Sequence, residues 1–132
     1  MKNILKYQLP PLLWVIIVYT LSAISDIQSI YNLPPGVDKI VHAAFYFILC
    51  WLVWRAFKYQ RTLPMMRNGA LLGAFIFSVA FCSLDEYHQT FVHGRTADIY
   101  DVFAAAGGAL LFVAISSLQH RHAQEDEENP RS

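Results

Sequence analysis

The residues best suited to chemistry in this chain are acids, a histidine and amides at helical spacing. Asp38 and His42 are four residues apart, so a helix would place both side chains on one face. Further along, a polar stripe repeats every three or four residues, with Asp85 beside it; its members are Ser78, Cys82, Glu86 and Gln89. A carboxyl group next to an imidazole is a usual pair for general acid–base chemistry.

A third group of ionisable side chains follows shortly after, made of Arg95, Asp98 and Asp101. A guanidinium suits the bidentate binding of a phosphate or carboxylate. Carboxylates are ligands for hard divalent cations, so a metal ion, if one binds, is expected on Asp85, Asp98 and Asp101. The plainer reading is that Asp98 and Asp101 cap the start of a helix and stabilise its dipole.

The elements that position these residues are four apolar segments. They cover residues 9–25, 38–57, 68–87 and 101–119, and short polar connections separate them. Of the 132 residues, 55% are hydrophobic and only 15% are charged, more apolar surface than a soluble domain of this size can hide from water. A helix of about 17–25 residues crosses the hydrocarbon core of a bilayer. The sequence therefore predicts an all-α integral membrane four-helix bundle spanning residues 1–120.

Orientation follows from the basic residues, which concentrate in cytoplasmic loops of membrane proteins. One side of the predicted bundle carries eight of them: Lys2, Lys6, Arg55, Lys58, Arg61, Arg67, Arg121 and Arg131. The other side has only Lys39 and Arg95. Both termini are therefore predicted to be cytoplasmic. The polar tail, residues 121–132, contains an acidic run and is predicted to be solvated and disordered.

Ionisable groups at membrane depth are costly, so they usually face one another or a water-filled cavity. The polar residues at the predicted outer ends of the helices should therefore converge on one outward-facing site. The expected members are Asp38, Lys39, His42, Asp85, Glu86, Gln89, Arg95, Asp98 and Asp101. Alternatively, these side chains lie separately in the headgroup region and cap their own helices.

Other classes of function have weaker support. The net charge is zero, so no basic surface predicts nucleic-acid binding. Cys50 and Cys82 both lie in apolar segments and are expected to be buried thiols, not a disulfide. No ligand spacing singles out a zinc site on His42, His88 and His93. Four short helices make a poor conduit unless they oligomerise, which remains possible.

One ordered set of residues resembles a family signature. It reads Asp38-Lys39-x-x-His42, then Asp85-Glu86-x-x-Gln89-x-Phe91-x-x-Gly94-Arg95-x-x-Asp98-x-x-Asp101, followed by Gly108. This pattern is similar to that of VanZ-like membrane proteins, a family named for an accessory protein associated with teicoplanin resistance. The resemblance implies a multi-pass protein of the bacterial cytoplasmic membrane, associated with the cell envelope. Where the family usually has Asn, this chain has Ala105.

Two functions fit these residues. In the first, the outward-facing site binds an envelope lipid, a lipid-linked cell-wall precursor or a glycopeptide-type antibiotic, with Arg95 meeting an anionic group while His42 and Gln89 orient the ligand. In the second, the protein is a membrane-embedded hydrolase or transferase that acts on a lipid-linked substrate, with His42 and Glu86 as acid and base. Membrane lipids are the expected partners, and no cofactor is expected.

Overall fold

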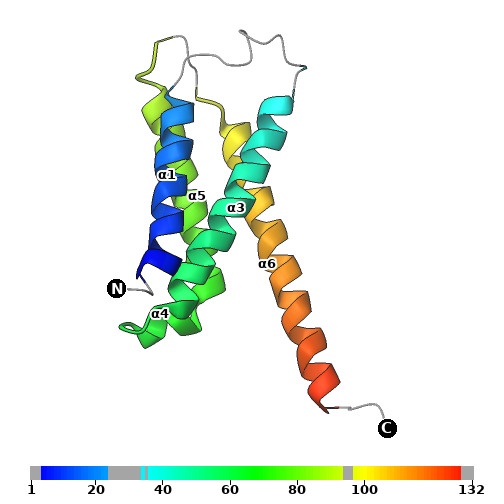
Figure 1. Ribbon diagram of the computed structural model, residues 1–132. Helices are drawn as coiled ribbons and strands as arrows, with labels where there is room; N and C mark the ends of the chain where they lie inside the picture. The colour runs from blue at the N-terminus through cyan, green and yellow to red at the C-terminus, as the bar shows by residue number, and fades with distance from the viewer. Residues whose placement is uncertain (1–3, 24–33, 35, 94–96, 129–132) are drawn as a thin grey trace.

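The computed structural model describes residues 4–23, 34, 36–93 and 97–128, and the described part is mainly helical, without strands. The all-α class predicted from the sequence is thus confirmed. The elements are η1 (Ile4–Gln8), α1 (Leu9–Ser22), α3 (Val37–Tyr59), α4 (Pro64–Asn68), α5 (Ala70–Gln89) and α6 (Ile99–Glu128). Figure 1 shows them in chain order.

Three of these helices are long and apolar enough to cross a membrane: α3, α5 and the part of α6 from Ile99 to Gln124. In the first predicted segment, residues 9–25, the helix α1 covers Leu9–Ser22. Residues 24–25 of that segment lie outside the described part. The wider π-helical turn of η1 precedes α1. Pro10 and Pro11 lack the N–H groups that would bond carbonyls one turn earlier, which accounts for the irregular entry.

The central helix is α3, which packs against α1, α5 and α6. In Figure 1, α1 and α5 lie on one side of α3, while α6 crosses it on the other side. Buried side chains from α1, α3, α5 and α6 meet along α3. They are Val18 from α1; Tyr46, Leu49, Cys50 and Val53 from α3; Ala74 and Cys82 from α5; and Ala105, Ala109 and Phe112 from α6. Both cysteines are free and buried, as predicted.

The helices α3 and α6 approach each other closely at Gly108. A Cβ atom on this residue would lie 2.7 Å from the carbonyl carbon of Ala43 and 2.9 Å from its Cα. Small residues at such crossings let two helix backbones come together in a membrane protein. The run of alanines and glycines in the fourth predicted segment therefore serves to bring the start of α6 next to the start of α3.

The helix α6 (Ile99–Glu128) continues past the predicted boundary at residue 120. Residues 121–128 contain neither Gly nor Pro and are rich in good helix formers.

The two ends of the molecule differ in chemistry. At the end that contains η1 and α4, the guanidinium of Arg55 lies 5.0 Å from the Trp51 ring centroid, and the ammonium of Lys58 lies 5.2 Å from that of Trp54. The end of α6 lies toward the same side (Figure 1). The opposite end, where α3 and α6 begin and α1 and α5 finish, holds Asp38, Asp85, Glu86, Asp98 and Asp101.

Candidate functional site

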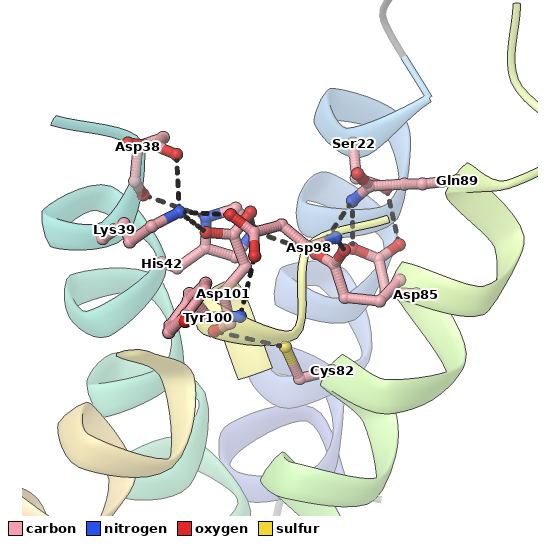
Figure 2. A network of polar contacts seen from close by, with 11 residues as sticks. Ser22, Asp38, Lys39, His42, Cys82, Asp85, Gln89, Asp98, Tyr100 and Asp101 are labelled. Carbon is pink, nitrogen blue, oxygen red and sulfur yellow. Dashed lines mark hydrogen bonds and ion pairs between the residues drawn. The ribbon is translucent and has the colours of Figure 1, made fainter. Parts of the chain in front are cut away.

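The candidate site is formed by the first turns of α3 and α6 and the last turns of α1 and α5 (Figure 2). Four of its polar residues are almost fully enclosed: exposure is 2% for Asp85, 4% for Glu86, 1% for Gln89 and 6% for Asp101. Burial on this scale is unusual for acids unless they have partners. The first question is therefore which groups satisfy them.

Lys39 is the main cation among the described residues of the site. Its Nζ donates to Asp98 Oδ2 at 2.7 Å, to Asp101 Oδ1 at 2.8 Å and to Asp38 Oδ2 at 3.0 Å. The three N–H donors of one ammonium thus meet three carboxylates from two helices. This hub joins the start of α3 to the start of α6.

Asp98 precedes α6 and acts as its cap. Its Oδ1 accepts the backbone N–H of Tyr100 at 2.9 Å, the usual bond of an N-cap residue. The hydrogen bond from Lys39 lowers the pKa of Asp98 below its ordinary value, and the Tyr100 N–H adds to this effect. The capping role weighed from the sequence is thus present, together with an ion pair that capping does not require.

Glu86 connects this hub to α5. Its Oε2 accepts the backbone N–H of Asp98 at 3.0 Å, while its Oε1 accepts a hydrogen bond from Gln89 at 3.4 Å. The carboxylate therefore anchors the connection before α6 and keeps Oε1 directed toward the interior of the site.

His42 has a defined orientation. Its Nδ1 lies 2.9 Å from the backbone oxygen of Asp38. Because a carbonyl can only accept, Nδ1 carries a hydrogen, and Nε2 is the nitrogen that faces the acids. Nε2 lies 3.6 Å from Glu86 Oε1 and 3.9 Å from Asp101 Oδ2. An imidazole held in this way can act as a base or a metal ligand through Nε2.

A second polar network lies beside the first. Ser22 of α1 donates to Asp85 Oδ1 at 2.5 Å, and Gln89 donates to Asp85 Oδ2 at 3.5 Å. Because Gln89 also bonds Glu86, it links the two networks. Ser22 is a site residue that the sequence reasoning missed, since it sits at the end of an apolar segment without a charged neighbour to mark it.

The floor of the site is formed by Cys82 and Tyr46. The Cys82 thiol donates to the backbone oxygen of Asp101 at 3.9 Å. Tyr46 lies one turn after His42 on α3, with the two rings nearly parallel and their centroids 6.4 Å apart. Ala105, about one turn after Asp101 on α6, is buried in the apolar core. The site therefore ends in a hydrophobic layer.

The structure brings together eight of the nine predicted site residues, while Arg95 lies outside the described part of the chain. Of the ligands expected for a metal ion, Asp85 bonds Ser22 and Gln89 and, among the described residues, is not grouped with Asp98 and Asp101. Two other groups have ligand atoms within 4.8 Å of one another: His42 with Glu86 and Asp101, and Asp38 with Asp98 and Asp101. The spacing along one helix could not reveal these inter-helix groupings.

The remaining histidine contacts do not add to the site. The Tyr19 hydroxyl lies 2.9 Å from His88 Nε2 in an exposed contact on the surfaces of α1 and α5. His88 and His93 belong to neither potential metal-binding group of the described residues. A zinc site shared by His42, His88 and His93 therefore has no geometric support.

Comparison with known proteins agrees with this picture. The family VanZ/LLP1 matches residues 2–120, which is nearly the whole chain. No curated protein and no solved structure gives a significant match. The long apolar helices and the family match together identify a membrane protein. The chain belongs to the VanZ/LLP1 family.

Proposed function

We propose that this protein resides in the bacterial cytoplasmic membrane and binds the headgroup of an envelope lipid or lipid-linked cell-wall precursor at an outward-facing polar site. One observation carries the proposal: polar side chains of four helices converge, mostly buried, at one end of an otherwise apolar bundle. A site at the end of membrane helices lies at the depth of lipid headgroups, and its hydrogen-bonding groups match polar ligands.

The proposed orientation is supported by the opposite end. Arg55 and Lys58 lie there over tryptophan rings, an arrangement suited to the cytoplasmic interface of a membrane. With four spans, both termini would be cytoplasmic and the acids would face outward. A reporter fused at the C-terminus should then be active only as a cytoplasmic protein. A reporter inserted near Val92 should be active only outside, and the reverse pattern would contradict the orientation.

The charges of the site define the ligand further. Five acids face one lysine and a histidine among the described residues, which leaves an excess of negative charge; the acids are Asp38, Asp85, Glu86, Asp98 and Asp101. A headgroup that offers amino and hydroxyl donors would fit this excess better than a bare phosphate. Aminosugars on a lipid-linked precursor or on a glycopeptide antibiotic have this character.

The binding test uses the full-length protein in nanodiscs. Lipid-linked precursor, a glycopeptide antibiotic and a phosphatidylglycerol control are each titrated against wild type and Glu86→Gln. The control variant is Ser83→Ala, an exposed position on the same helix. Precursor or antibiotic binding that weakens at least tenfold in Glu86→Gln, but not in Ser83→Ala, supports the proposal. If Glu86→Gln and Ser83→Ala both bind all three ligands as tightly as wild type does, the proposal is contradicted.

A second candidate is a membrane-embedded hydrolase or transferase for the same lipid-linked class. The orientation of His42 favours it, because the backbone oxygen of Asp38 fixes one ring nitrogen and the other faces Glu86 at 3.6 Å. Turnover of a lipid-linked substrate by wild type that disappears in a folded His42→Asn variant would support catalysis. If wild type binds the lipid-linked substrate but does not turn it over, the result supports ligand binding and not catalysis.

A further inference from the structure

We propose that His42, Glu86 and Asp101 form a binding site for a divalent first-row metal ion such as Zn²⁺ or Mn²⁺. The inference rests on the proposed function for the role of the site and deepens it by assigning a cation to it. One imidazole and two carboxylates form a donor set that suits these ions.

The three donors come from three helices and meet at one point. His42 belongs to α3, Glu86 to α5 and Asp101 to α6, and their ligand atoms lie within 4.8 Å of one another. His42 Nε2 is 3.6 Å from Glu86 Oε1 and 3.9 Å from Asp101 Oδ2. Donor atoms bound to one ion at about 2.0–2.2 Å lie roughly 3–3.5 Å apart. The two distances from His42 Nε2 would therefore shorten by less than about 1 Å on metal binding, and the two carboxylates, within 4.8 Å of each other, would close to the same range.

The histidine is already oriented for coordination. A metal-bound imidazole generally donates its second ring N–H to a carbonyl or carboxylate, which fixes the tautomer. In this protein, the backbone oxygen of Asp38 accepts from Nδ1 at 2.9 Å, so that Nε2 points at the two acids. Both distances from Nε2 to the carboxylates of Glu86 and Asp101 exceed 3.5 Å, longer than a direct hydrogen bond.

The second acidic group does not qualify as a metal site. Asp38, Asp98 and Asp101 have ligand atoms close together, but the Lys39 ammonium lies among them and bonds all three. That group therefore contains its own cation. Glu86 has no such partner among the described residues, and Asp101 Oδ2, unlike Oδ1, is left to face His42.

A separate feature also points to a missing polar partner. The Tyr46 hydroxyl is buried, with the residue only 1% exposed, and has no hydrogen-bond partner among the described residues. Its ring lies parallel to that of His42, and Cys82, Asp85 and Glu86 are its polar neighbours. An unpaired buried hydroxyl is costly. A polar group beside Cys82, Asp85 and Glu86, such as a water molecule on a bound ion, would supply the partner.

A bound ion would also change which ligands the site accepts. Three protein ligands leave coordination positions open, as in zinc sites that bind a water or substrate. The ion would offset part of the negative charge and present a Lewis acid to a headgroup oxygen. The carbonyl of Asp38 and the amide of Gln89 would keep His42 and Glu86 in position.

The test measures Zn²⁺ binding directly, without any lipid. Purified protein is stripped with a chelator and titrated with Zn²⁺ by calorimetry, with Mn²⁺ binding followed by electron paramagnetic resonance. Wild type should bind one ion per chain. His42→Gln should weaken binding at least tenfold, because loss of even an outer partner costs about 10–100-fold in metal affinity. The matched control, His88→Gln, removes a histidine of α5 outside the site and should bind like wild type.

A second variant covers the case in which His42→Gln does not fold. Glu86→Asp keeps the charge but withdraws the carboxylate, and it should also weaken Zn²⁺ binding at least tenfold. Helix content and thermal unfolding are measured for each variant. Absence of a stoichiometric ion in wild type, or equal weakening by His88→Gln, would overturn the proposal. Headgroup binding that persists in excess chelator would leave the proposed function intact, whereas Zn²⁺ binding without headgroup binding would overturn only that function.

Discussion

Substitution of Gly108 by alanine should separate α3 from α6 and thereby disrupt the polar site. The added Cβ would meet the backbone of Ala43, with its carbonyl carbon at 2.7 Å, its Cα at 2.9 Å and its carbonyl oxygen closer still. Ordinary contact begins at 3.4 Å. The two backbones must therefore move apart by at least about 0.7 Å, the difference between 3.4 and 2.7 Å. No flexible side chain can absorb this shift.

The expected cost is the balance of two effects. Alanine is the better helix former by about 0.5–1 kcal/mol. Overpacking that displaces backbone costs typically 1–3 kcal/mol, and here the clash with a main chain places the cost at the upper end. Gly108→Ala should therefore destabilise the protein by about 1–2.5 kcal/mol. The separation would also move Asp101 away from Lys39 and His42, since these pairs join the same two helices.

The neighbouring glycine provides the control. A Cβ on Gly107 would meet nothing within 4 Å, so Gly107→Ala should be neutral or slightly stabilising. Thermal unfolding of both variants in detergent, followed by circular dichroism, measures the difference, and ligand binding reports on the site. If Gly108→Ala unfolds at or above the wild-type temperature, the close α3–α6 approach is incorrect. If Gly107→Ala is equally harmful, the effect does not come from this contact.

Three further perturbations test the polar networks. Lys39→Met should destabilise the protein by about 1–3 kcal/mol in thermal unfolding, less than the loss of a fully buried ion pair because the Lys39 side chain is one-third exposed. Adding Asp101→Asn to this variant should recover part of the loss. If the effects of the two substitutions simply add, Lys39 and Asp101 are not coupled. Ser22→Ala should cost about 1–3 kcal/mol by removing a donor to the Asp85 carboxylate, and an unchanged unfolding temperature would contradict this bond. Because Lys39 lowers the pKa of Asp98, the stability from this pair should be complete above the unfolded-state value of about 3.9 and disappear as the pH falls through the lower folded-state pKa. Asp98→Asn should therefore flatten the acid limb of a pH–stability curve, and an unaltered limb would refute the assignment.

Several features could be predicted from residue order because they depend on local spacing or on composition. The lengths of the apolar segments predicted helices suited to a membrane, and α3, α5 and α6 have that character. The spacing of Asp38 and His42, and of Glu86 and Gln89, predicted shared helix faces. A helix repeats every 3.6 residues whatever its tertiary contacts, so such pairs follow from the sequence itself.

The pairing between helices required the tertiary structure. The sequence grouped Asp85 with Asp98 and Asp101 as possible metal ligands, whereas the structure separates Asp85 and places it against Ser22. The sequence placed Lys39 in one site with several acids, but nothing local to Lys39 indicated that it would bond Asp98 and Asp101, about sixty residues further along the chain. Such contacts depend on how each helix is rotated and how closely it approaches its neighbour. That geometry is set by the packing of α6 on α3 at Gly108, where the absence of one side chain permits the contact.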